Sequence, residues 1–207
     1  ENLIKKGQVL DTLLESLIID KSIKVSDLLI GDKNALFIAI RRLAYGDSYG
    51  PLQIKCNSCG VDNNTNIDLS QIKEREYDLS KLTKGENKFS FVLPYSKIPV
   101  EFKILTHNDE QEIDVELKAM GKIHKNMSFE VTTRLKHVLL SVNGNPSKSY
   151  IANFVNNELM SRDSIALRKY VKECSPDLDM SFNFECKECQ SIERVGVPMT
   201  VQFFWPE

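Results

Sequence analysis

Two pairs of cysteines, separated by most of the chain, restrict the possible folds more than any other feature. Cys56 and Cys59 form one Cys-x-x-Cys pair, and Cys186 and Cys189 form the other. Two thiolates three positions apart on a tight turn can bind one tetrahedral zinc ion, and a second such turn completes a structural site with four cysteine ligands. The 126 residues between Cys59 and Cys186 far exceed the ~15–20 of a compact zinc ribbon. If the pairs share one ion, two distant segments must meet in the fold.

The residues around both pairs support joining them. Apolar and polar residues alternate over Leu52–Lys55 before the first pair and over Phe182–Glu185 before the second, as in half-buried strands. At the same distance beyond each pair, Ile67 and Val197 begin short apolar stretches. The pattern predicts a strand, a cysteine turn and a strand in each half, and hence zinc-ribbon-like β-hairpins.

Other uses of the cysteines are less favoured. A thioredoxin-like redox pair precedes a helix, whereas neither pair is followed by helical periodicity. Structural disulfides are uncommon in a chain without a secretion signal. Four thiolates leave no open position for the water of a catalytic zinc. The fifth cysteine, Cys174, shares an apolar helix face with Leu167, Tyr170 and Val171, so we predict a buried, inert thiol.

Composition and charge exclude several classes of protein. Of the 207 residues, 42% are hydrophobic and 27% are charged, as in ordinary globular domains. The net charge of −2 argues against a nucleic-acid binder, which normally carries a basic excess. No apolar run approaches the ~18 residues that span a bilayer, and the first residues lack the apolar stretch of a signal peptide. We therefore expect a soluble, cytosolic protein.

Helical periodicity dominates the first 45 residues. One amphipathic helix is predicted from the spacing of Leu10, Leu13, Leu14, Leu17 and Ile18. A second helix begins near Gly31, and its expected buried face consists of Leu36, Ala39, Ile40 and Leu43.

The segment between the cysteine pairs combines a hairpin with helices. Alternation over residues 89–93 and 100–104, across a turn at 94–97, predicts a β-hairpin. Thr106 and Asp109 fit the N-terminal cap of a helix. Further helices are predicted over 151–159, over 163–174 and along the stripe of Val131, Leu135, Val138, Leu139 and Val142.

Together these patterns predict an α+β fold. N-terminal helices precede four-cysteine, zinc-ribbon-like β-hairpins from two distant segments, into which a β-hairpin and a helical bundle are inserted. The expected divisions are 1–50, then 51–70 joined to 181–207, then the insertion 71–180, with one compact domain as the alternative.

No group of residues predicts catalysis. The polar cluster from His107 to Glu110 suits the first turn of a helix, where acidic residues are favoured. His124 and His137 lack partners at a spacing that suggests a metal or a catalytic triad. Arg41 and Arg42 could touch phosphate, but such a pair usually forms a solvated face or an ion pair. We expect a protein without enzymatic activity.

The C-terminal segment contains three consecutive aromatic residues, Phe203, Phe204 and Trp205. In a strand, neighbouring side chains point to opposite faces. The tail can therefore pack on its own core, which we favour, or present aromatic anchors to a partner, as many protein interfaces do.

A set of short motifs runs in order from about residue 30 to the C-terminus. These are Gly31-Asp32-Lys33-Asn34, Ile40-Arg41-Arg42, Tyr45-Gly46, Cys56-x-x-Cys59-Gly60 with Ile67-Asp68-Leu69, Phe91-Val92-Leu93-Pro94 with Leu105-Thr106 and Asp109-Glu110, Ser141-Val142-Asn143-Gly144, and Phe184-x-Cys186-x-x-Cys189 with Phe203-Phe204-Trp205-Pro206. The set resembles the baseplate hub assembly proteins of T-even-type contractile-tailed bacteriophages. Gln190 departs from the pattern, because such a turn often has glycine after its second cysteine, and we expect a looser turn there.

The resemblance implies a phage protein that acts in forming the central hub of the tail baseplate. It implies contacts with other hub proteins, work in the cytoplasm of the infected host during tail assembly, and a place in the baseplate of the virion. The alternative function is a zinc-ribbon accessory factor that binds nucleic acid. Residues 54–69 and 182–197 lack the basic excess that such binding needs.

Overall fold

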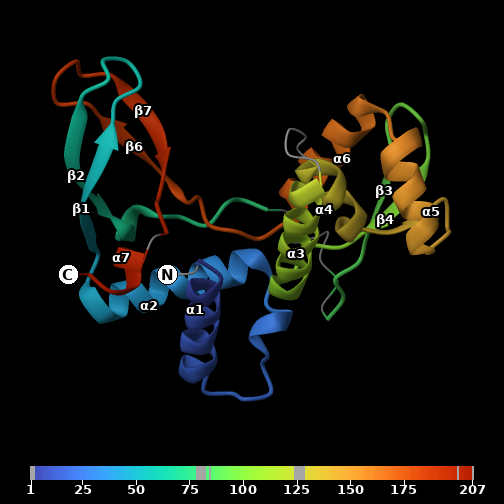
Figure 1. Ribbon diagram of the computed structural model, residues 1–207, viewed down its shortest axis with the longest axis horizontal. Helices are drawn as coiled ribbons and strands as arrows, with labels where there is room; N and C mark the ends of the chain where they lie inside the picture. The colour runs from blue at the N-terminus through green and yellow to red at the C-terminus, as the bar shows by residue number, and fades with distance from the viewer. Residues whose placement is uncertain (1–2, 78–82, 84, 124–128, 200, 207) are drawn as a thin grey trace. The chain divides into compact units, whose positions relative to one another are not determined.

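The computed structural model (Figure 1) describes residues 3–77, 83, 85–123, 129–199 and 201–206. The chain divides into two compact units, each assembled from segments that are far apart in sequence. Unit 1 comprises Glu1–Ser16, Gly31–Arg75 and Asp177–Glu207, and unit 2 comprises Leu17–Ile30 and Glu76–Pro176. Antiparallel hairpins and helices occur in both, so the predicted α+β class is confirmed.

Unit 1 holds both cysteine pairs. Its elements are almost all of α1 (Leu3–Leu17) and α2 (Ile30–Tyr45), then β1 (Ser48–Lys55), β2 (Asp62–Asp68), the 3-10 turn η2 (Leu69–Gln71), β6 (Ser181–Glu185), β7 (Ile192–Gly196) and α7 (Val201–Phe204). The strands form two separate antiparallel hairpins, β1–β2 and β6–β7.

The second strand of each hairpin begins closer to its cysteine turn than predicted. Strands were expected from Ile67 and from Val197, but β2 and β7 start at Asp62 and Ile192. Directly across each turn, Lys55 pairs with Asp62 and Glu185 pairs with Ile192. Backbone pairing defines these strands, and an exposed strand needs no run of apolar residues to form it.

The predicted buried face of α2 is wrong. Phe37, Ile38 and Arg41 are buried instead, while Leu43 is 89% exposed. The Phe37 ring packs against Phe204 of α7, with ring centroids 4.9 Å apart. A segment from the other end of the chain thus determines which side of the helix is covered.

Unit 2 is built around a three-stranded sheet in the order β3–β4–β5. Its elements are η1 (Val25–Asp27), β3 (Phe89–Val92), β4 (Pro99–Phe102), α3 (His107–Ile123), α4 (Glu130–Val138), β5 (Leu139–Val142), α5 (Lys148–Asn153), the π-helical turn η4 (Phe154–Glu158) and α6 (Ser161–Cys174). The predicted hairpin over 89–104 is confirmed as β3 and β4.

The predicted helix over 131–142 is correct only as far as Val138. Leu139–Val142 forms β5, in which Val142 pairs with Val100 and Leu139 pairs with Phe102 of β4. The apolar stripe fits a helix, but the unpaired edge of β4 offers this segment backbone hydrogen bonds and burial together. Tertiary pairing therefore overrides the local pattern.

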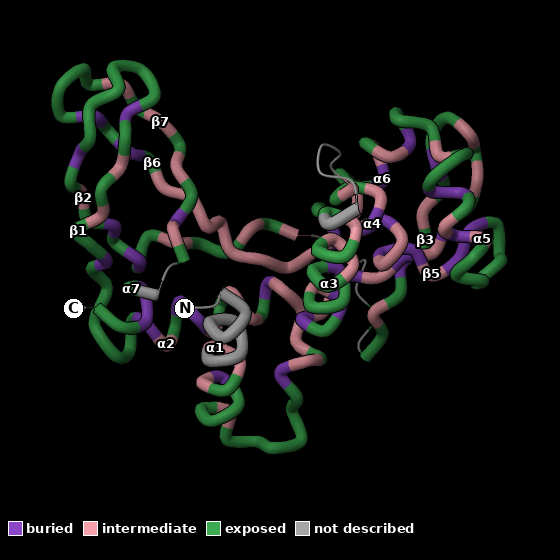
Figure 2. The backbone as a smooth tube through the Cα atoms, in the orientation of Figure 1, coloured by how far each residue is buried: buried purple, intermediate pink, exposed green. Residues whose placement is uncertain are grey.

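The core of unit 2 lies between the sheet and α4, α5 and α6 (Figure 2). Phe102, Phe154 and Leu167 are almost fully buried there. Cys174 is 1% exposed, which confirms the prediction of a buried thiol.

Two carboxylates hold backbone turns in unit 2. Asp109 accepts a hydrogen bond from the Thr106 N–H at 2.9 Å, which confirms the predicted helix cap. Asp163 is fully buried and accepts hydrogen bonds from the backbone N–H groups of Tyr95 and Ser96, both at 2.9 Å. Desolvation acts to raise the pKa of Asp163, but these donors lower it overall.

Candidate metal centre

Both cysteine turns have the same backbone geometry. In the first, the N–H of Gly60 donates to the Cys56 carbonyl at 2.9 Å. In the second, the N–H of Gln190 donates to the Cys186 carbonyl, also at 2.9 Å. The two segments thus form matching knuckles, each of which presents two thiols.

The looser turn expected at Gln190 is not found. Gln190 has a φ of 57° and Gly60 a φ of 76°, so both occupy the left-handed region. A residue with a side chain is disfavoured there by ~1–2 kcal/mol. The second knuckle therefore closes as tightly as the first, at a conformational cost that the first does not carry.

The fold brings together the sulfur atoms of the predicted ligands. The Sγ atoms of Cys56, Cys59, Cys186 and Cys189 all lie within 4.8 Å of one another. The distances Cys56–Cys189 and Cys59–Cys186 are both 3.7 Å. A tetrahedral ion with metal–sulfur bonds of about 2.3 Å requires sulfur–sulfur distances of ~3.8 Å. The cluster can therefore hold one tetrahedral metal ion between the knuckles.

Hydrogen-bond donors surround the two buried sulfurs. The Ser191 hydroxyl lies 3.3 Å from the Sγ of Cys56 and lowers its pKa most. The backbone N–H of Cys189 is the main cause that lowers the pKa of Cys186 to about 6, and the side-chain amide of Asn63 contributes at 3.5 Å. Both environments shift the pKa of the thiol toward the thiolate, which is the form that binds metals.

The pKa of Cys59 moves in the opposite direction. The N–H of Val61 acts to lower this pKa, but desolvation and the three neighbouring thiols together raise it to about 12. Four thiolates whose sulfur atoms lie within 4.8 Å of one another would repel one another. A bound divalent cation would offset that repulsion. Deprotonation of all four cysteines and binding of a metal ion are therefore coupled.

Each knuckle is also held by a side chain from the opposite hairpin. Glu193 of β7 accepts hydrogen bonds from the backbone N–H of Asn57 at 2.9 Å and from its side-chain amide at 2.6 Å. Asn63 of β2 accepts from the backbone N–H of Lys187 at 3.0 Å. The sequence analysis missed these residues. Their signal is that each lies four positions after the second cysteine of its own knuckle.

The apolar support of the knuckles is small. Buried Phe184 packs with Cys56 and Cys186, and three half-buried side chains complete the cluster: Ile54, Phe182 and Val195. A two-stranded hairpin is at best marginally stable in water by itself. The two hairpins therefore depend on contacts across the cysteine cluster, including the bonds of Glu193 and Asn63, for much of their stability.

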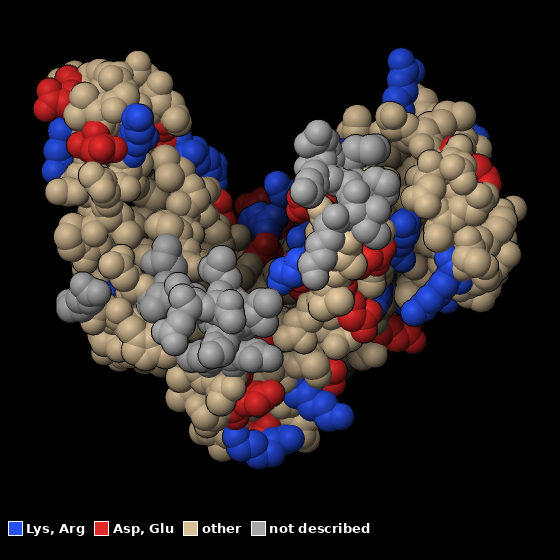
Figure 3. Space-filling view, viewed as in Figure 1, with Lys and Arg blue, Asp and Glu red and all other residues tan. Residues whose placement is uncertain are grey.

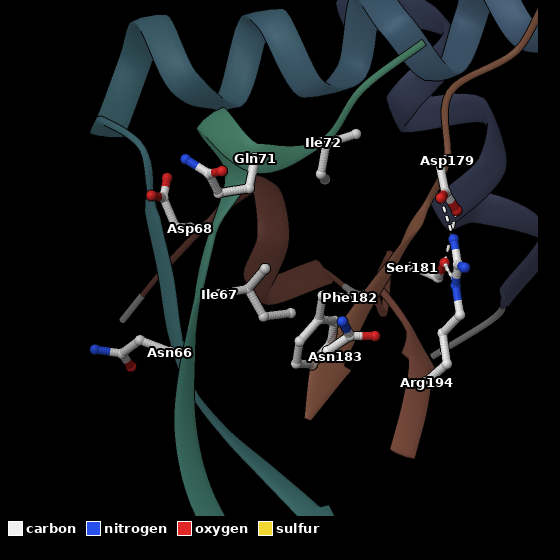
Figure 4. A pocket seen from close by; sticks show the side chains of 10 residues that line it. All are labelled: Asn66, Ile67, Asp68, Gln71, Ile72, Asp179, Ser181, Phe182, Asn183 and Arg194. Atoms are coloured by element: carbon white, nitrogen blue, oxygen red, sulfur yellow. Dashed lines mark hydrogen bonds and ion pairs between the residues drawn. The ribbon is translucent and has the colours of Figure 1, made fainter. Parts of the chain in front are cut away.

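A pocket of about 440 Å³ lies between β2 and β6 of unit 1 (Figure 4). Ile67 and Phe182 line it together with polar side chains. At one side, Arg194 forms an ion pair with Asp179 and donates to the Ser181 hydroxyl at 2.6 Å. These bonds hold the base of the β6–β7 hairpin.

Among the predicted polar candidates, His107 begins α3 and lies 3.1 Å from the Gln111 side chain. His137 lies 3.1 Å from Glu116 and 3.8 Å from Glu112, on the neighbouring helix. A second group that could hold a metal, Asp109 with Glu112 and His137, has its most buried carboxylate already paired with Lys103 at 2.6 Å. His124 lies outside the described residues.

The aromatic tail is a short helix rather than a strand. Phe203 is fully buried and packs edge-on against Tyr49, with centroids 4.9 Å apart, and Phe204 is only 5% exposed. Burial leaves neither ring accessible to a partner, since both belong to the core of unit 1. Trp205 remains 44% exposed.

The family model described as T4 bacteriophage base plate protein matches residues 2–205 of the chain. No curated protein and no solved structure matches it. Among the described residues, no helix has the length and apolar character needed to span a membrane.

Proposed function

Because the chain belongs to the T4 bacteriophage base plate protein family, we propose that it is a tail assembly protein that acts in formation of the central hub of the baseplate, through contacts with other hub proteins. The protein acts without catalysis, in the cytoplasm of the infected host, and its place in the finished virion is the baseplate. The family match over nearly the whole chain carries this proposal, and the ordered motifs from residue 30 onward supply the assignment to the hub.

We propose structural zinc as the metal, bound by Cys56, Cys59, Cys186 and Cys189. Four thiolates in tetrahedral arrangement suit zinc, and the sulfur–sulfur distances of 3.7 Å support it. With four protein ligands the site is closed, so its role is to join the two hairpins of unit 1. Metal analysis of freshly purified protein tests this assignment, with about one zinc per chain expected.

Partner contacts of the tail are assigned to Trp205, because its neighbours are buried. The experiment that tests the whole proposal is pairwise co-expression with the hub proteins of the same phage, followed by capture at increasing salt. A DNA mobility-shift titration over the same salt range separates this function from that of a nucleic-acid-binding zinc ribbon. Binding to hub proteins without a salt-dependent DNA shift supports hub assembly.

A further inference from the structure

Arg41 of α2 is a buried cation with few polar contacts. Its side chain lies in unit 1 and is 4% exposed. The Nη2 atom donates one long hydrogen bond, 3.4 Å, to the Ser48 carbonyl. Within the described part of the chain, Nε and Nη1 have no hydrogen-bond partner. Burying a charge without an anion is costly. The buried guanidinium therefore lowers the stability of the free chain.

Aromatic rings partly stabilise the Arg41 guanidinium. The Tyr45 ring lies 4.6 Å from its central carbon, and the Tyr49 ring lies 5.8 Å away. These contacts place the cation over π-electrons, but Nε and Nη1 still have no hydrogen-bond partner among the described residues. The carboxylate of Asp47 forms an ion pair with the neighbouring Arg42 instead, with 2.5 Å between Oδ1 of Asp47 and Nε of Arg42. The geometry therefore presents a guanidinium that still requires an acceptor.

The surface next to this guanidinium has the composition of an interface. Tyr45, whose ring lies over Arg41, is 50% exposed. On the face drawn in Figure 3, few Lys, Arg, Asp or Glu side chains lie over α7, and charged side chains of unit 1 gather near the knuckles. The exposed Arg42–Asp47 ion pair lies at the C-terminal end of α2. Interface centres are depleted in charged residues, and tyrosine, tryptophan and arginine dominate their binding energy.

We propose that Arg41 and Tyr45 form the anchor for an aspartate or glutamate side chain of another baseplate protein. This inference rests on the proposed function and names the chemistry of its contact. Tyr45 turns aside, and the partner's carboxylate accepts hydrogen bonds from the unpaired Nε and Nη1 of Arg41. A partner seated over this site excludes water from it, which strengthens the charge-assisted bonds.

The decisive variant is Arg41→Met, which keeps the apolar stem and removes the charge. Arg42→Met on the same helix is the matched control, because Arg42 is exposed and already paired. The probes are the other baseplate proteins of the same phage, each co-expressed with the full-length, metal-loaded chain. Thermal unfolding of the free chain and the dissociation constant of each pair are measured for both variants.

In Arg41→Met the melting temperature of the free chain should rise, whereas the affinity for the partner should fall. Removing an unpaired buried charge raises the melting temperature by roughly 3 °C. Losing one member of a desolvated charge pair weakens binding by about 30-fold or more, which is ~2 kcal/mol at 1.4 kcal/mol per tenfold. Arg42→Met should change both quantities little. In the partner that binds, replacing the responsible carboxylate by its amide should weaken wild-type binding equally and leave binding to Arg41→Met unchanged.

Two results would overturn the inference while leaving the proposed function intact. If Arg41→Met binds its partner as tightly as the wild type, no carboxylate uses this anchor. If Arg41→Met melts at a lower temperature, the arginine is a structural clamp of unit 1. If no baseplate protein binds the wild-type chain, the proposed function fails, and the anchor fails with it.

Discussion

Loss of the proposed metal should unfold the hairpins of unit 1 while the core of unit 2 survives. The clearest perturbation is Cys186→Ala, with Cys174→Ala as its control. Both thiols are buried, at 0% and 1% exposure, and both substitutions remove the same atom. The two variants therefore differ mainly in whether a proposed metal ligand is lost.

The magnitude follows from the loop that the metal closes. With 126 residues between Cys59 and Cys186, the chain-entropy model assigns ~5 kcal/mol to the cross-link. The small cluster around Phe184 cannot replace this contribution, because whole domains are stable by only ~5–15 kcal/mol. Cys174→Ala should cost only ~1 kcal/mol, as an ordinary small deletion in a core.

Urea unfolding followed by tryptophan fluorescence isolates the effect, because the single tryptophan, Trp205, lies in unit 1. In Cys186→Ala the fluorescence midpoint should fall by roughly 2 M or disappear, given a slope of ~2 kcal/mol/M. Circular dichroism should retain a second transition from the helices of unit 2. Chelation of the wild type should reproduce the Cys186→Ala curve and zinc content.

Equal fluorescence midpoints for the two variants and the wild type would refute the joined-knuckle reasoning. So would a fully zinc-free wild type that unfolds at the midpoint of the untreated protein. In either case the hairpins would be held by their apolar contacts and cross-bonds alone.

Three further predictions concern single side chains. Gln190→Gly should stabilise unit 1 by up to ~1 kcal/mol and Gly60→Gln should destabilise it by ~1–2 kcal/mol, since both positions have left-handed φ values; urea midpoints that move the other way would contradict this. Phe203→Ala should cost ~3–5 kcal/mol of stability, whereas Trp205→Ala should cost less than ~1 kcal/mol and reduce capture of hub proteins; equal melting temperatures would refute the burial argument. The pKa of Asp163 is lower in the folded chain than in the unfolded chain. Its contribution to the free energy of unfolding is therefore complete above the unfolded pKa of ~3.9 and is lost as pH falls through the folded value. The Asp163→Asn variant should be less stable than the wild type at neutral pH and should lose less stability than the wild type below about pH 4.

Features that depend on near neighbours in the chain were predictable from the sequence. The Cys-x-x-Cys spacing defines a turn that presents two thiols, whatever surrounds it. Thr106 and Asp109 cap their helix through bonds across three residues. The β3–β4 hairpin follows from strict alternation on both sides of a short turn. In each case the interacting atoms are so close in sequence that little chain entropy opposes the contact.

Features that depend on contacts between distant segments were not predictable from the sequence. The apolar stripe that ends at Val142 is compatible with one continuous helix. It is equally compatible with the helix α4 followed by the strand β5, and pairing with the edge of β4 selects the second arrangement. Burial of Phe37 rather than Leu43 requires α7, which comes from the other end of the chain. Glu193 and Asn63 gain their roles only when the opposite knuckle is in place.

The sequence by itself therefore determined the two turns that each present a pair of thiols, the α+β class and the local caps, because these depend on residue type and short spacing. The tertiary structure alone decided that the two knuckles share one cluster, that Phe203 is core while Trp205 is exposed, and that Arg41 is buried without an anion among the described residues. Burial and charge pairing are properties of the space around a side chain. That space is filled by segments whose position no local pattern specifies.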